Sequence, residues 1–269
     1  AGGGMTAMLA SEEEARSFLE QYDASGTVEL AALNGARQTV LCGPLNALQQ
    51  LETAAARAGI SLKPLPVSHA FHSALMEPVL DEFASVVAGI SLHEPTIPVV
   101  SNLTGAFAQP GQLSSPDYWV RHIRGTVRFL DGFHALQTLH PRIWLELGPS
   151  GVLTSLCRRE GGDTQDMVWL SSLRAATPEW PQVCAALGEL YKNGAAIDWG
   201  AFAAGQGWGR IQLPLYPFQG QRFWVDDSFR GIANSSAQDQ AGRGFPTGND
   251  IWQQIRASAE AGATASVHR

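Results

Sequence analysis

The pattern of apolar and polar residues over the first 67 positions predicts a compact α+β unit. Apolar residues recur at helical spacing around Phe18 and again around Leu51. Short apolar runs that are typical of strands flank these two helical segments. The predicted strands are residues 5–9, 27–33, 38–42 and 62–67. The order βαββαβ is that of a ferredoxin-like subdomain, although a generic small α+β unit has the same pattern.

Local signals mark the ends of these elements. Ser11 and Glu14 have the spacing of a capping box, so the first helix is expected to start there. Asn34-Gly35 predicts a hairpin turn between the second and third strands. Pro44 is expected at the first position of the second helix, because proline already lacks the amide hydrogen that is unused there.

Strands and helices alternate over residues 68–175, which indicates α/β layers. A break is expected at Gly125 inside the helical run from 118 to 139. The expected strands are 95–100, 142–147 and 167–173, and the other expected helices are 75–87, 151–156 and 179–192.

The rest of the chain changes character. Residues 211–225 contain two prolines and four aromatic residues, and we expect an extended segment packed on a surface. Residues 226–269 have the composition of a flexible linker, in which Ile251, Trp252 and Ile255 could form a short helix. The predicted parts are 1–67, 68–175, 176–225 and 226–269.

Composition limits the function classes. Net charge is −7 and the pI is about 5.5, so nothing supports nucleic-acid binding. No apolar run approaches the ~20 residues that span a membrane, and no signal peptide is recognisable. Three distant cysteines suggest neither a disulfide framework nor a zinc site, so a cytoplasmic location is expected. The chain begins with Ala1 rather than Met, and we expect it to be part of a longer protein.

The densest polar cluster is Ser68 to Ser73, between a predicted strand and a predicted helix. Loops of this kind often carry functional groups. His69 and His72 could share a helical face and bind a metal, but no third ligand follows at a suitable spacing. One of them could be a general base. Taken alone, the pattern favours two buried, satisfied histidines.

A nucleophile is harder to identify. The chain has no Gly-x-Ser-x-Gly motif. Ser150 lies in a Gly-Pro-Ser-Gly turn, and Cys42 and Cys157 fit small core positions. Pattern and motif therefore indicate a candidate base without a partner nucleophile.

Five ordered motifs resemble the acyltransferase domain of modular type I polyketide synthases. They are VSHAFHS (67–73), PVVSN (98–102), YWVRHIR (118–124), ELGPSGVL (146–153) and LPLYPFQ (213–219). The resemblance covers about residues 2–225, and the last motif resembles the linker that follows such domains.

The resemblance implies an α/β fold: a ferredoxin-like small subdomain (α+β) inserted in an α/β-hydrolase-like large subdomain, followed by an extended linker. Only the C-terminal part of the large subdomain would be present. The family's nucleophilic Ser and the Arg that pairs with the malonyl carboxylate would precede Ala1, so the isolated chain is expected to be inactive.

The resemblance also assigns roles to residues. His72 matches the catalytic base, and His122 matches the position whose backbone carbonyl orients that base. His69, Ala70 and Phe71 match the form of the motif associated with malonyl selection, in which Phe71 would exclude an α-methyl branch. Asn102 matches a position near the active site, where a structural role is equally open.

The activity implied is transfer of malonyl from malonyl-CoA to the phosphopantetheine of an acyl carrier protein, by a Ser/His ping-pong mechanism. No cofactor or metal is implied in this domain itself. The implied partners are malonyl-CoA, a carrier domain, and the neighbouring ketosynthase and linker domains. Two alternatives stay open: a malonyl/acetyl transferase of a fatty-acid synthase, and a non-catalytic scaffold or docking fragment.

Overall fold

The computed structural model describes residues 2–161, 166–209 and 211–220. It separates into two units, Ala1–Ile197 and Asp198–Arg269. The elements of the first unit are β1 Gly3–Met8, α1 Glu12–Tyr22, β2 Glu29–Gly35, β3 Gln38–Pro44, α2 Leu45–Arg57, β4 Leu62–Pro64, the 3₁₀ helix η1 Ala74–Val79, α3 Leu80–Ala88, β5 Val100–Ser101, β6 Ala106–Phe107, α4 Pro116–Arg124, α5 Phe129–Gln137, β7 Ile143–Glu146, α6 Val152–Gly161, β8 Val168–Ser171 and α7 Glu179–Lys192. The boundaries at residues 67, 175 and 225 stay predictions.

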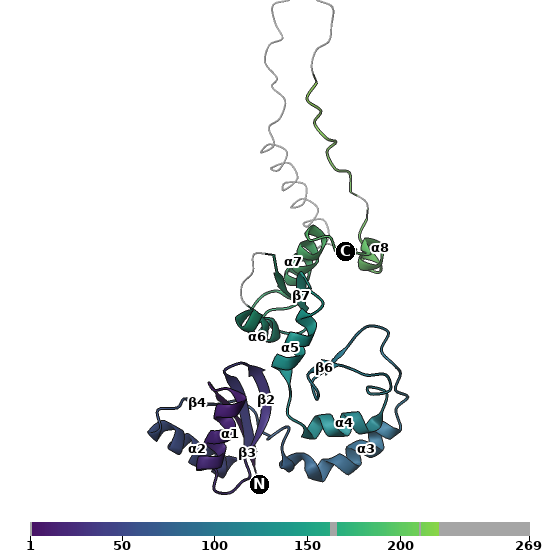
Figure 1. The fold of residues 1–269 in the computed structure, drawn as a ribbon. Coiled ribbons are helices and arrows are strands. Elements are labelled where there is room, and N and C mark those ends of the chain that lie inside the picture. The colour runs from purple at the N-terminus through teal and green to yellow at the C-terminus, as the bar shows by residue number, and fades with distance from the viewer. Residues whose placement is uncertain (1, 162–165, 210, 221–269) are drawn as a thin grey trace, which may run out of the picture. The chain divides into compact units, whose positions relative to one another are not determined.

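The predicted βαββαβ order is confirmed (Figure 1). The sheet is antiparallel with strand order β2-β3-β1-β4. Because side chains alternate across a strand, Leu41 joins the core shared with α1 and α2, while Val40 and Cys42 face the other side. On that other side the sheet packs against Ala70, which follows β4.

Two boundary predictions are wrong by one or two residues. The hairpin turn lies at Ala36-Arg37, because Asn34 and Gly35 still belong to β2 and Gly35 pairs with Gln38 of β3. The Ala36 amide there donates to the carboxylate of Glu160, 3.1 Å away. Pro44 precedes the second helix as its N-cap, rather than occupying the first helical position.

The capping box of α1 is present, since Ser11 and Glu14 exchange both hydrogen bonds. The break predicted at Gly125 is also confirmed. Gly125 ends α4, and its amide donates to the Arg121 carbonyl at 2.8 Å.

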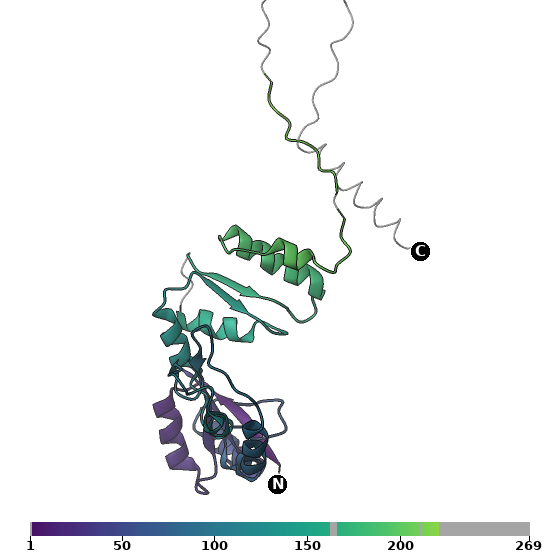
Figure 2. The same cartoon turned by 90° about the vertical axis from the view of Figure 1, so that its right-hand side faces the viewer.

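The strand predicted at residues 95–100 is wrong over most of its length. Only Val100 and Ser101 form β5. Pro95 and Pro98 cannot donate to a sheet ladder, and Ile97 is 72% exposed. The later strand predictions hold, since β7 and β8 pair in parallel from Ile143–Val168 to Glu146–Ser171 (Figure 2).

The antiparallel sheet is also bonded to the segment before α5. Val127 lies beside β2, donating to the Ala31 carbonyl and accepting from the Leu33 amide, both at 2.8 Å. The hydroxyl of Thr126 donates to the Leu30 carbonyl at 2.7 Å. These bonds connect the sheet to the end of α4, where the candidate site lies.

In the second unit, α8 Trp199–Ala203 is capped by the Asp198 carboxylate, which accepts from the Ala201 amide. Residues 211–220 form neither helix nor strand, as predicted. Residues 221–225, and the helix expected around Ile251 to Ile255, lie outside the described residues. Within the described part of the chain, no helix is long and apolar enough to cross a membrane.

Candidate active site

The candidate site is the loop between β4 and η1. His72 has a left-handed backbone conformation, with φ of 62°, which is uncommon for residues other than glycine. Ser73 stabilises this turn from both sides: its hydroxyl donates to the Ala70 carbonyl at 2.7 Å and accepts from the Leu75 amide at 3.2 Å. Because Ala70 is buried against the sheet, the loop has a fixed base.

Two strand residues of the sheet also hold this loop. Glu29, the first residue of β2, accepts from the Ala74 amide at 3.0 Å. Cys42 pairs with Glu29 in the β2–β3 ladder, and its thiol donates to the His72 carbonyl at 3.6 Å. The backbone on each side of His72 is therefore anchored to the small subdomain.

The His72 imidazole is half-buried against the end of α4. Burial lowers the pKa of His72 below its ordinary value of 6.5. The backbone of Gly125 and of His122 acts in the opposite direction, which places both beside the ring. Nδ1 of His72 is buried and makes no hydrogen bond of normal geometry. The predicted bond from Nδ1 to the His122 carbonyl stays a prediction.

His122 lies edge-on to His72, with ring centroids 6.1 Å apart and ring planes at 88°. The ring of Tyr118 stacks on His122 at 5.9 Å, and the hydroxyl of Tyr118 is hydrogen-bonded to that of Ser101 at 2.9 Å. Burial first, and then the charge of His72, lower the pKa of His122. The two neighbouring imidazoles therefore both favour their neutral forms.

The other predicted site residues occupy different surroundings. Nδ1 of His69 lies 2.8 Å from the Ser68 hydroxyl, and its ring tilts toward Phe71 at 5.8 Å. Phe71 is 45% exposed. Asn102 is exposed on the turn after β5, and its carbonyl accepts from the Arg128 amide.

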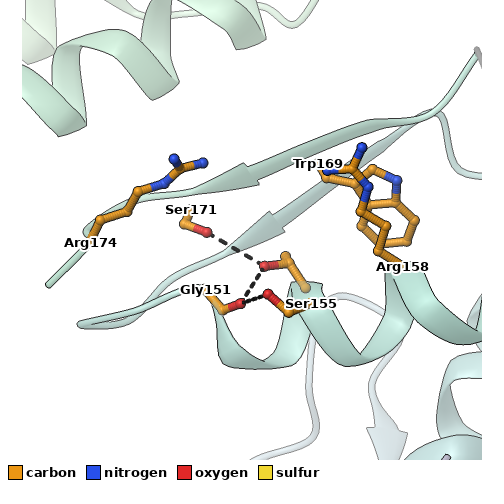
Figure 3. A pocket seen from close by; sticks show the side chains of 7 residues that line it. Gly151, Ser155, Arg158, Trp169, Ser171 and Arg174 are labelled. Carbon is orange, nitrogen blue, oxygen red and sulfur yellow. Dashed lines mark hydrogen bonds between the residues drawn. The ribbon is translucent and has the colours of Figure 1, made fainter. Parts of the chain in front are cut away.

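The Gly-Pro-Ser-Gly turn leads to a separate cavity of about 340 Å³. Figure 3 shows Arg158 and Arg174 extending from α6 and from the segment after β8, with Ser171 between them. Its lining residues are Gly151, Thr154, Ser155, Arg158, Trp169, Ser171 and Arg174. Neither His72 nor His122 lines this cavity. The carboxylate of Glu146 accepts a hydrogen bond from the Thr154 amide at 2.8 Å, so this amide of the first turn of α6 already has a partner.

Within residues 2–161, 166–209 and 211–220, no group of three His, Cys, Asp or Glu side chains is placed to hold a metal ion. Cys42 is not a reactive thiol, because burial raises its pKa to about 12. Burial likewise raises the pKa of Cys157, to about 11. His72 is half-buried with a lowered pKa, and its neutral imidazole is thus a group suited to accept a proton.

The family model described as "Acyl transferase domain" matches residues 2–194. Among similar proteins, polyketide synthase GfsB of Streptomyces halstedii is 40% identical over 242 residues, covering 88% of this chain and 4% of that protein. Phenolphthiocerol synthesis polyketide synthase type I Pks15/1 of Mycobacterium bovis is 39% identical over 236 residues, covering 88% and 11% respectively. This chain thus spans a small part of these relatives.

Solved structures point to the same family. The acyltransferase domain from the second module of the salinomycin polyketide synthase has a TM-score of 0.70 and 37% identity, covering 79% of this chain and 49% of that one. The fold also resembles that of malonyl CoA-acyl carrier protein transacylase from Clostridium perfringens, with a TM-score of 0.63 at 21% identity, covering 72% and 58%. The chain therefore belongs to the acyl transferase domain family, in the form found in modular type I polyketide synthases.

Proposed function

We propose that this chain supplies the general base of an acyltransferase that moves malonyl from malonyl-CoA to the phosphopantetheine thiol of an acyl carrier protein. The observation that carries the proposal is the state of His72. Its ring is half-buried, and burial lowers its pKa, so the imidazole is neutral near pH 7. A base must be unprotonated at the working pH to accept a proton.

In the first half-reaction, a serine on a segment outside this chain attacks the thioester carbonyl of malonyl-CoA. Nε2 of His72 takes the serine proton as the new C–O bond forms. The C–S bond then breaks, and the CoA thiolate leaves with the proton from His72. The product of this step is a malonyl-serine ester.

In the second half-reaction, the phosphopantetheine thiol attacks this ester, and His72 takes the thiol proton. The C–O bond to serine breaks, and His72 returns the proton to the serine oxygen. His72 thus alternates between base and acid, as an imidazole side chain is able to do. The proposed role of the His122 carbonyl is to accept a hydrogen bond from the Nδ1–H group of His72, which leaves Nε2 unprotonated and free to act as the base. The position of the His122 backbone beside the His72 ring supports this role.

The proposed preference for malonyl rests on Phe71. Its ring is exposed next to His69, on the same loop as the base. A ring there would occupy the space that an α-methyl branch of methylmalonyl requires. One methyl group is worth ~1–3 kcal/mol in a pocket, so the preference would be about 10–200-fold.

The proposed partners are malonyl-CoA, a carrier domain, and the neighbouring ketosynthase and linker domains. We place the reaction in the cytoplasm, which the three free cysteines support. A malonyl/acetyl transferase of a fatty-acid synthase would use the same base and would also accept acetyl-CoA. A non-catalytic scaffold would carry no acyl group at all.

The test is covalent labelling with radioactive malonyl-CoA, methylmalonyl-CoA and acetyl-CoA. We expect no hydroxylamine-labile label on the 269-residue chain by itself. The same chain joined to a nucleophile-bearing acyltransferase segment upstream of Gly2 should be labelled, with malonyl preferred. A label on the chain alone would mean that its nucleophile lies within it. An acetyl label as strong as the malonyl label would favour the fatty-acid synthase, and no label on the joined protein would favour the scaffold.

A further inference from the structure

An ion pair ties the strand side of the His72 loop to the end of α4. Arg124 is the last residue of α4, and its guanidinium holds the Glu29 carboxylate at two points. Nη1 lies 2.6 Å from Oε2, and Nη2 lies 3.1 Å from Oε1. A bidentate pair of this kind fixes orientation as well as distance. Nε of Arg124 also donates to Glu77 of η1 at 3.2 Å.

The same carboxylate reaches the backbone beside the candidate base. Oε1 of Glu29 accepts from the amide of Ala74, two residues after His72. The thiol of Cys42 lies 3.5 Å from the Glu29 carbonyl and 3.6 Å from the His72 carbonyl. Glu29 therefore holds the loop from the strand side while it holds Arg124 on the helix side.

The contact between Glu29 and Arg124 matters because the His72 ring packs against the end of α4, where Arg124 lies. Arg124 directly precedes Gly125, and the backbone of Gly125 and of His122 lies beside the imidazole. Glu29 thus connects the loop that carries His72 to the helix end against which the ring is buried. The titratable or charged groups around the loop are Glu29 of β2, Cys42 of β3, Glu77 of η1, and His122 and Arg124 of α4.

We propose that Glu29, through its pair with Arg124, is a positioning residue that keeps the His72 imidazole seated against the end of α4. The catalytic purpose of this positioning rests on the proposed function, whereas the contacts themselves do not. Both side chains are 32% exposed. A pair this exposed contributes little to global stability, so its loss should loosen the loop without unfolding the chain.

The test is an NMR titration of the full 269-residue chain with isotope-labelled histidine. The resonances of His72 are identified from their loss in His72→Gln. Glu29→Gln keeps an acceptor for the Ala74 amide but removes the charge that binds Arg124. Arg124→Lys keeps the charge but loses the two-point grip of the guanidinium. Glu77→Gln is the matched control, since it removes a carboxylate from the same arginine without touching the loop backbone.

We expect the pKa of His72 to rise toward its ordinary value in both Glu29→Gln and Arg124→Lys, because the loosened ring gains water. The direction is decisive, since removing a nearby negative charge alone would lower the pKa of a histidine. Glu77→Gln should therefore leave the pKa of His72 unchanged or slightly lower. We also expect the ring of both test variants to sample both neutral tautomers.

A pKa of His72 that is unchanged or lowered in both test variants would overturn the proposal, because Glu29 would then act only as a surface charge. Far-ultraviolet circular dichroism checks that each variant is folded. If Glu29→Gln does not fold, Arg124→Lys decides the question. The readout requires no acyl transfer, so it can fail while the labelling experiment succeeds, or succeed while the labelling experiment fails.

Discussion

His72 combines an unusual backbone with an unusual ring environment. Its φ of 62° is supported by contacts from Ser73, Cys42 and Glu29, so the loop is specified by residues from three separate segments. Such positions cost free energy and persist only when the surroundings determine them. This support directs the ring into the half-buried site where a neutral imidazole is favoured.

Stability should depend on pH through these two imidazoles. The pKa values of both His72 and His122 are lowered in the folded state. As pH falls below about 6.5, the unfolded chain binds protons that the folded chain resists, so the free energy of unfolding decreases. The decrease ends once pH is below the folded pKa values. At pH values well above 6.5, the two histidines contribute no pH dependence to the free energy of unfolding.

Urea unfolding between pH 7.5 and 5 measures this effect. His72→Gln should show a smaller loss of stability over that range than the unsubstituted chain does. The pKa of His122 should rise in the same variant, because the charge of His72 no longer opposes its protonation. An equal loss of stability in both proteins would show that folding does not lower the pKa of His72.

At this scale, the sequence was informative about some site residues and silent about others. His72 and His122 were found because they lie in short recognisable motifs. Glu29 and Arg124 were not, because 95 positions separate them in the chain. A charge at the start of an otherwise apolar strand was the only signal that Glu29 offered, and such charges are usually solvent-exposed.

At the scale of elements, predictions were best where one local pattern decides the structure. The helix Glu179–Lys192 was predicted to the residue, and the βαββαβ order follows from periodicity and turns. The prediction of a strand at 95–100 was wrong because it followed the apolar residues of the segment. Pro95 and Pro98 lack the amide hydrogens that a sheet requires. The pairing of Val127 with β2 joins distant segments, which periodicity does not reveal.

The antiparallel sheet should depend on Leu41, which is fully buried between the sheet and its two helices. Leu41→Ala is expected to lower the free energy of unfolding by about 2–5 kcal/mol, because it removes packed atoms and leaves a cavity. Leu9→Ala is the matched control, since Leu9 is 66% exposed, and it should change stability by less than about 0.5 kcal/mol. Urea denaturation compares the two. Equal effects would mean that Leu41 does not belong to a packed core.

At the scale of the whole molecule, the sheet serves as the platform of the candidate site. One face buries α1 and α2, and the other face receives Ala70, the loop with His72 and the segment around Val127. His72 is therefore positioned by residues of the antiparallel sheet and by the end of α4 together. The chain covers 49% of a similar solved acyltransferase domain.

The measurement that tests the central claim most directly is the rate of malonyl transfer to a carrier domain by the joined protein, with and without His72. We expect His72→Gln to reduce turnover by ~10²–10⁴-fold, because a general base contributes about that much. His93→Gln is the control, since His93 is exposed and has no proposed role. The variant should keep the circular dichroism spectrum of the parent. Turnover by His72→Gln within a few-fold of the parent rate would contradict the claim and remove His72 from the mechanism.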